Sequence, residues 1–446
     1  MVRRDKMMVR WSLWCVCLVL ALCAAGCGDE QEDADDANDV GNNGVNNDQN
    51  NGGDDENNDV GNNDVNNDQN NDQNNDQNND ANNGPGLTLE LTRVASPVLD
   101  PRQAVSPPTR DNTMLGILDP CSVWDPVDGV WRVYFSFFDS TSEAQGLTRA
   151  GIMGSSSPDG RSFEVYDDLA LEQQGTFDLG SVETCDVVHL EDPESPTGRR
   201  FLMFYSGNSA FDPEDVLDEE DVEFVIAMAT STDGVRFEPL EAELSRDGVA
   251  GALFGVEESL GGEAQGGNII TDPTVVIKDG LFHMWTLCIK LLPEPSGGIC
   301  HHTSADAVNW EHHGIVSGLN RAFPIQPTVF YNPQTDLFEM YVVMDTPEEE
   351  AQIHDANENL ALRVTGFYHA TSADGMTWQE SPGQAFSEDT SLLWENGGLA
   401  TAADATYLDG EVYFFYPSFT TEGGSLLGNL LNWPLSLAMR LADDGQ

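Results

Sequence analysis

The sequence predicts an all-β protein, a five-bladed β-propeller of four-stranded antiparallel blades, preceded by a signal peptide and a disordered tether. The first observation behind this prediction is a phrase, Ser-x-Asp-Gly-x-x-(Trp/Phe), that recurs at nearly even spacing at residues 157–163, 231–237, 304–310, where Ala307 replaces the glycine, and 372–378. The second is an aromatic-rich, strand-like segment that precedes each phrase and occurs once more near the C-terminus. Repetition of a strand-rich unit of this length is typical of propeller blades.

Each repeat contains the same order of expected elements. A short strand leads into a turn, which is Asp-Gly in three repeats because both residues tolerate positive φ. An aromatic strand, a third strand and the phrase follow. The phrase predicts a hairpin turn in which Ser and Asp bond the local backbone, while its aromatic residue packs between neighbouring sheets. The fifth repeat lacks the phrase, so residues 87–94 are expected to supply its outer strand. The aromatic strands are residues 130–137, 200–205, 281–287, 337–343 and 411–416.

The N-terminus has the features of an export signal. A basic patch that ends at Arg10 is followed by an apolar run, residues 11–25, which is too short to cross a membrane stably. The run ends in Ala24-Ala25-Gly26-Cys27, which resembles the lipobox of bacterial lipoproteins. We therefore expect residues 1–26 to be a lipoprotein signal peptide and Cys27 to be lipidated. Gly28 stands where Asp would retain a lipoprotein in the inner membrane, so the expected location is the bacterial outer membrane or cell surface. An ordinary signal peptide is the alternative.

Residues 27–86 form the predicted tether. Beyond the cysteine, the segment is built from Asn, Asp, Gln and Gly and contains no aromatic residue, Lys or Arg. It cannot bury enough apolar surface to offset its chain entropy, so we expect disorder. Residues 87–446 remain for the propeller.

The charge of the chain limits its partners. The formal net charge is −58, which disfavours nucleic acid and anionic lipid. Contact with a membrane is therefore expected only through the lipid anchor. A neutral substrate is compatible with this charge, and we expect a monomer.

Four cysteines lie outside the export segment. An even number in an exported chain predicts disulfides. Cys288 and Cys300 flank a connection between two apolar runs, so a bond between them would staple a hairpin, and Cys121 and Cys185 would then pair by elimination. A catalytic thiol is disfavoured because no cysteine has a motif around it.

The first strand of each blade runs beside the central axis, so the residues that begin these strands should converge at one mouth of the channel. Four of the five are carboxylates, which are costly to crowd together without a purpose. The alternative is that they cap strand ends and hold waters or a cation; an axial Ca²⁺ would relieve the repulsion. No cofactor is required. The five residues are Asp119, Asp186, Asp272, Gln326 and Asp404.

From about residue 110 to residue 440, the repeats resemble the five-bladed propellers of glycoside hydrolases. The group includes family 43, with its arabinanases, β-xylosidases and arabinofuranosidases, and the related levanases and invertases. The resemblance implies hydrolysis of a neutral extracellular poly- or oligosaccharide. It makes Asp119 the general base and Asp272 an orienting carboxylate. The family's acid position is held by Gln326, which cannot donate a proton as an acid does, so Glu183 or Glu263 would have to substitute.

The resemblance also implies residues that contact the carbohydrate. Asp186, Gln326 and Asp404 would bind it, and Trp124 and Trp285 would stack on sugar faces, although such aromatic residues are more often inter-blade core. The competing hypothesis is a non-catalytic propeller lipoprotein that binds glycan or a protein partner at the cell surface. A zinc site among His301, His302, His312 and His313 is disfavoured because adjacent strand residues point to opposite faces.

Overall fold

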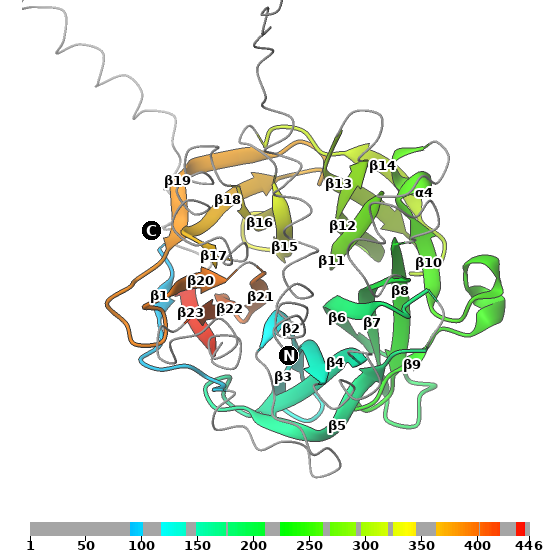
Figure 1. Ribbon diagram of the computed structural model, residues 1–446, viewed down its shortest axis with the longest axis horizontal. Coiled ribbons are helices and arrows are strands. Elements are labelled where there is room, and N and C mark those ends of the chain that lie inside the picture. The colour runs from blue at the N-terminus through cyan, green and yellow to red at the C-terminus, as the bar shows by residue number, and fades with distance from the viewer. Residues whose placement is uncertain are drawn as a thin grey trace, which may run out of the picture. The chain divides into compact units, whose positions relative to one another are not determined.

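The computed structural model describes residues 90–100, 117–139, 149–174, 177–209, 224–261, 268–290, 296–319, 324–344, 363–400, 402–419 and 434–441. In these residues the chain forms antiparallel sheets arranged as five blades around a central axis (Figure 1). The predicted all-β five-bladed propeller is confirmed. The signal peptide, Cys27, the tether and Glu263 lie outside the described residues, so the expectations for them remain predictions.

Each blade is a meander whose first strand lies innermost, beside the axis (Figure 1). Blade 1 contains β2 (Leu118–Asp125), β3 (Val130–Asp139), β4 (Arg149–Ser157) and β5 (Glu164–Glu172). Blade 2 contains β6 (Ser181–Glu191), β7 (Arg199–Asn208), β8 (Phe224–Ser231), β9 (Glu238–Pro239) and β10 (Ala252–Gly255). Blade 3 contains β11 (Ile269–Lys278), β12 (Leu281–Lys290), β13 (Ser296–Ser304) and β14 (Glu311–Ile315). Blade 4 contains β15 (Ile325–Asn332), β16 (Leu337–Val343), β18 (Gly366–Ser372) and β19 (Gln379–Ser387).

Blade 5 joins the two ends of the described chain. It contains β21 (Asp404–Leu408), β22 (Glu411–Phe419), β23 (Leu435–Leu441) and, outermost, β1 (Thr92–Arg93), with β20 (Gly398–Ala400) and β17 (Arg363–Val364) beside β22. Thr92 pairs with Met439, which confirms the predicted N-terminal strand (Figure 1). The Nε of Arg93 lies 2.8 Å from the buried carboxylate of Glu395, so an ion pair supports this closure. The short helices η2 (Ala242–Leu244) and η3 (Arg246–Gly248) lie between β9 and β10 of blade 2, and α4 (Val256–Leu260) follows β10.

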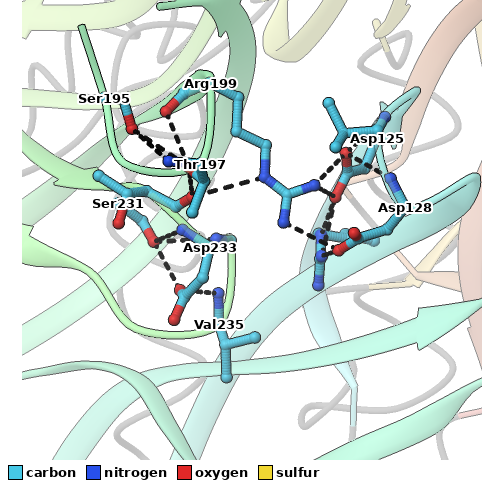
Figure 2. A network of polar contacts seen from close by, with 12 residues as sticks. Asp125, Asp128, Ser195, Thr197, Arg199, Ser231, Asp233 and Val235 are labelled. Carbon is cyan, nitrogen blue, oxygen red and sulfur yellow. Dashed lines mark hydrogen bonds and ion pairs between the residues drawn. The ribbon is translucent and has the colours of Figure 1, made fainter.

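The repeated phrase is a hairpin turn, as predicted. In blade 2, the hydroxyl of Ser231 donates to Asp233 Oδ1 at 3.0 Å and accepts from the N–H of Gly234 at 2.9 Å (Figure 2). Asp233 Oδ1 also accepts from the N–H of Val235 at 2.8 Å. Gly234 has φ 69°, the left-handed conformation that favours glycine, and Ala307 adopts φ 65° at the same place in the third phrase.

The aromatic residue of each phrase packs on the second strand of the preceding blade. These edge-to-face contacts add specific geometry to the burial of apolar surface, so each phrase fixes one blade against the next. The ring pairs are Phe163 with Phe415 at 5.9 Å, Phe237 with Tyr134 at 5.4 Å, Trp310 with Phe204 at 5.8 Å, and Trp378 with Trp285 at 5.9 Å.

Candidate functional site

One residue in or just before the first strand of each blade has a left-handed backbone, which is uncommon for residues other than glycine. In β2, β6, β11 and β15 the pairing with the next strand shifts across this residue, as in a β-bulge, a feature that re-aims side chains. We call these residues the mouth ring. They are Asp119 (φ 47°), Thr184 (49°), Asp272 (55°), Gln326 (48°) and Ala402 (62°).

The mouth ring lines a pocket at the axis to which all five blades contribute. The pocket is open to solvent, and the space in and directly above it amounts to about 350 Å³. None of the described residues that line it is aromatic or carries a positive charge. The lining residues are Asp119, Pro120, Thr184, Cys185, Asp186, Asp272, Pro273, Thr274, Gln326, Pro327, Thr328, Ala402, Ala403 and Asp404.

All five residues predicted to converge at the axis line this pocket, but they do not hold equivalent places in their blades. Asp119, Asp272 and Gln326 occupy the mouth ring, but its places in blades 2 and 5 are held by Thr184 and Ala402. Asp186 and Asp404 line the same pocket two residues further along their strands. The sequence pattern treated the acidic residue nearest to each strand start as the equivalent one. In the structure, the equivalent residues are those that share the left-handed backbone.

Asp186 and Asp404 belong to a belt of hydrogen bonds between blades, with Thr274 and Thr328 at the equivalent places. Each belt side chain accepts from a backbone N–H of the next blade. Burial raises the pKa of both acids, and repulsion from Asp404 raises that of Asp186 further. Both carboxyl groups are thus committed to blade contacts, and their role in substrate binding stays a prediction. The donors are Val275 N–H to Asp186, Val329 N–H to Thr274 at 3.1 Å, Ala405 N–H to Thr328 at 2.8 Å, and Ser122 N–H to Asp404 at 2.9 Å.

Blade 1 has Cys121 at the belt position. Instead of accepting a hydrogen bond, it forms a disulfide with Cys185 of blade 2, with 5.8 Å between the Cα atoms. The second disulfide joins Cys288 and Cys300 on the neighbouring strands β12 and β13. Both predicted disulfides are confirmed.

Three acidic residues interact where blades 1, 2 and 3 meet. Burial and the negative charge of Glu183 raise the pKa of Asp119 to about 7, although the hydroxyl of Ser136, 3.0 Å away, lowers it. Burial raises the pKa of Asp272 well above its usual value, and the charges of Asp119 and Glu183 add to this. Glu183 therefore acts on both carboxyl groups from the residue just before Thr184.

A cluster of hydroxyl groups connects these acids. Ser206 Oγ lies 2.9 Å and Thr184 Oγ1 lies 3.2 Å from Thr271 Oγ1. Thr271 donates to Asp272 at 3.4 Å, and the N–H of Thr184 donates to Ser136 Oγ at 3.2 Å. The acids are thus held in a polar frame in which few groups can move independently. The sequence pattern missed this cluster because its members come from four strands.

Gln326, on the opposite side of the mouth ring in blade 4, is 7% exposed. Its Oε1 is buried and has no hydrogen-bond partner among the described residues. A buried amide oxygen without a partner is costly, so a group of a ligand that donates a hydrogen bond would be favoured there.

The two predicted tryptophans do not lie in the pocket. Trp285 is fully buried between blades 3 and 4, and its Nε1–H donates to the carbonyl of Gly375 at 2.8 Å. Its predicted stacking on a sugar is therefore wrong. Trp124 packs against Trp131 with ring centroids 5.7 Å apart and is not among the residues that line the pocket. Both serve the core because packing between blades uses large aromatic surfaces.

The histidines of blade 3 divide between the two faces of the sheet, as predicted. His301 contacts His313, whereas His302 bonds His312 across 2.9 Å. Within the described part of the chain, no group of three or more His, Cys, Asp or Glu side chains is arranged to hold a metal ion. The axial cation stays a prediction. No helix in the described ranges has the length and apolar character needed to span a membrane.

No protein-family model matches the sequence, and no curated protein is similar to it. Solved structures do match. A β-1,2-mannobiose phosphorylase from Listeria innocua superposes with a TM-score of 0.54 and 10% identity, over 80% of this chain and 98% of its own. An N-acetylgalactosamine deacetylase from F. plautii gives 0.52 and 14%, over 79% and 95%. The catalytic domain of a family 62 α-L-arabinofuranosidase from Coprinopsis cinerea gives 0.50 and 13%, over 79% and 98%.

The chain has the fold of the five-bladed propellers that include glycoside hydrolases. The predicted resemblance is thereby confirmed for the fold. Membership of family 43 stays a prediction, since identity this low does not assign a family.

Proposed function

We propose that this protein is a glycoside hydrolase that acts at the axial pocket on a neutral extracellular poly- or oligosaccharide. The observation that carries the proposal is the pair of buried carboxyl groups of Asp119 and Asp272, which line the axial pocket together and repel each other. Glycoside hydrolysis needs two carboxyl groups in different protonation states. The names of the matching structures, an arabinofuranosidase and a mannobiose phosphorylase among them, support a sugar as the substrate.

The two acids take different roles in this proposal. Asp272, whose pKa burial raises well above its usual value, supplies the acid proton to the leaving group. Asp119, with a pKa of about 7, is ionised above that pH and acts as the base. Burial is the main cause of both pKa shifts, and the charge of Glu183 adds to each. Gln326 takes no part in proton transfer, and its free Oε1 accepts a hydrogen bond from a sugar hydroxyl.

The lining of the pocket favours water over phosphate as the second reactant. Phosphorolysis needs cationic groups to hold phosphate, and the described lining residues include no Arg, Lys or His. The same absence disfavours uronic acids and sulfated sugars, which leaves neutral sugars.

The competing function is glycan binding without catalysis. The observation in its favour is Gln326, which stands where the resembling family has its acid. Under this alternative, Asp119 and Asp272 are polar contacts for hydroxyl groups, and neither transfers a proton.

We also propose that the protein is monomeric and attached to the outer membrane or cell surface through lipid on Cys27. The support is the order of basic patch, apolar run and small residues before that cysteine.

The deciding experiment is an incubation of the protein with arabinan, xylan, fructan and mannan, with release of reducing ends as the readout. Asp119→Asn and Asp272→Asn serve as paired controls. Release by the wild type that both variants lose supports the hydrolase. Binding on the same panel without release supports the glycan-binding alternative. Neither release nor binding of any carbohydrate contradicts both.

A further inference from the structure

We propose that the Cys121–Cys185 disulfide is a positioning element of the pocket, which holds Asp119 of blade 1 at a fixed spacing from Glu183 and Thr184 of blade 2. This inference rests on the proposed function for its importance to activity, but not for its geometry. It concerns residues that touch the site without taking part in the chemistry.

The first support is the pattern of the belt. At four of the five blade junctions, a belt side chain accepts from a backbone N–H of the next blade. At the junction of blades 1 and 2, the corresponding N–H belongs to Val187, and it bonds the carboxylate of Asp186 in its own blade at 2.7 Å. The disulfide therefore replaces the belt contact at this junction.

The second support is what this junction carries. Cys121 lies two residues after Asp119, and Cys185 directly follows Glu183 and Thr184. The hydroxyl of Ser136 connects this junction to Asp119. It accepts from the N–H of Thr184 at 3.2 Å and donates to Asp119 at 3.0 Å. A covalent link next to these groups limits how far the two strands can separate.

Charge gives a reason for a cystine at this place. Two of the four other belt positions hold Asp, but a third Asp here would add a negative charge close to Asp119, Asp186 and Glu183. A disulfide joins the blades without adding charge and without needing a donor. A threonine, as at Thr274 and Thr328, would be the uncharged alternative that uses a hydrogen bond.

The other disulfide provides a matched control. Cys288 and Cys300 are fully buried and join β12 and β13, strands that already pair within blade 3. Neither residue lines the pocket. Its removal should lower stability without changing the geometry of the mouth ring.

The experiment compares Cys121→Ala/Cys185→Ala with Cys288→Ala/Cys300→Ala. The first readout is the titration of the Asp119 carboxyl by ¹³C NMR, assigned with Asp119→Asn. The second is the pH profile of hydrolysis on whichever glycan the wild type cleaves. Opening the junction should admit water and weaken the influence of Glu183, so the Asp119 pKa should fall from about 7 by one unit or more. Misplaced acids should lower kcat about tenfold to a hundredfold, with a smaller change in KM.

A repair variant tests the belt argument itself. Cys121→Thr/Cys185→Ala supplies the side chain that other junctions use and should restore most of the wild-type titration. If Cys121→Ala/Cys185→Ala does not fold, thiol reduction of folded Cys288→Ala/Cys300→Ala protein opens the remaining disulfide of the propeller for the same measurements.

The proposal is overturned if the Asp119 titration is unchanged without the disulfide, or if both disulfide variants change it equally. Because the NMR readout needs no substrate, failure of this inference is distinct from failure of the proposed hydrolase activity. If the wild type is inactive but the Asp119 titration shifts when the disulfide is removed, only the proposed hydrolase activity is contradicted.

Discussion

Two residues of the same type, Asp119 and Asp125, differ in acid strength because their surroundings differ. Burial and the charge of Glu183 raise the pKa of Asp119 to about 7. Burial also acts on Asp125, but hydrogen bonds from Arg132 and from the N–H of Asp128, with the charges of Arg132 and Arg199, outweigh it and lower its pKa. Proton chemistry is therefore available at the mouth ring and not at the buried ion network.

Glu183→Gln should lower the pKa of Asp119 and of Asp272, because the charge that raises both is removed. Ionised Asp119 then persists to lower pH, and protonated Asp272 is lost at lower pH. Both limbs of the pH–activity profile should therefore move to more acidic values. Ser181→Ala removes a hydroxyl that bonds Glu183 while keeping its charge, and it should leave the limbs near their wild-type positions. Limbs that move upward in Glu183→Gln would contradict this account.

Asp272→Asn should abolish hydrolysis of the natural glycan, with a loss of about a hundredfold to ten-thousandfold, since the acid proton is gone. An aryl glycoside of the same sugar with a good leaving group needs no such proton, so the variant should retain much of its activity on it. Asp119→Asn should be inactive on both substrates because its role is on the water. Equal losses on both substrates for Asp272→Asn would assign Asp272 an orienting role instead.

The innermost strands of the five blades share one arrangement and differ in the residues that they carry. Four of the five innermost strands carry a bulge at the mouth-ring residue, and in every blade a belt residue follows two positions later. At the turn between β2 and β3, a buried ion network joins blades 1 and 2: Arg199 Nη1 lies 2.7 Å from Asp125, whose side chain is fully buried (Figure 2). Arg199 Nη2 reaches Asp128 at 2.9 Å.

Arg199→Ala should destabilise the protein by about 3–5 kcal/mol, because it removes one cation from a carboxylate that has no access to water. Arg200→Ala is the matched control. Its neighbouring ion pair with Asp192 is exposed, with 52% of the arginine side chain accessible, so the loss should stay below about 1 kcal/mol. Denaturant unfolding gives both values, and similar losses in the two variants would refute the network's importance.

The histidines of blade 3 predict acid sensitivity. Burial and the nearby His312 lower the pKa of His302 well below 6.5. Below about pH 6.5 the His302 imidazole is protonated in the unfolded chain but stays neutral in the folded chain. The contribution of this residue to stability is therefore lost as pH falls through that value. The difference between the melting temperatures at about pH 7.5 and about pH 5 should therefore be smaller in His302→Leu than in the wild type. The variant comparison isolates this effect from the raised carboxyl groups of the pocket, which act in the opposite direction. A slope unchanged by the substitution would contradict it.

At the scale of the whole molecule, the ring is closed by its two ends. β1 adds the outer strand to a blade whose other strands come from the C-terminus, and Glu395, which accepts from Arg93, also accepts from the hydroxyl of Tyr416 at 2.5 Å. Closure removes the exposed edge of that blade. The belt, the phrases and the Cys121–Cys185 disulfide act at the same junctions from the axis outward.

The proposed anchor can be tested in the full chain. Expressed in a bacterium that processes lipoproteins and fed a palmitate analogue, the wild type should be labelled and Cys27→Ala should not. Cys23→Ala, a neighbouring cysteine inside the predicted signal peptide, should keep the label. Labelling of Cys27→Ala would show that the lipobox resemblance is accidental.

The sequence by itself determined the number of blades, the order of strands, the hairpin role of the repeated phrase, the N-terminal closing strand and both disulfides. These follow from periodic residues whose local conformation is set by their own chemistry: Asp-Gly for turns, aromatic runs for strands, Ser and Asp for backbone bonds. The sequence also placed Asp119 and Asp272 at the axis, because each lies near the start of a strand that runs beside it.

Tertiary structure alone decided which residues share a ring. In blades 2 and 5 the acidic residue lies two positions after the mouth-ring residue, so Asp186 and Asp404 are belt residues and Thr184 and Ala402 hold the mouth-ring places. Trp285, which was predicted to lie at the site, is buried in the core. Burial and the charge of Glu183 together raise the pKa of both Asp119 and Asp272. These outcomes depend on distances between blades that are far apart in sequence, and burial and charge at such contacts leave no periodic signal in the chain.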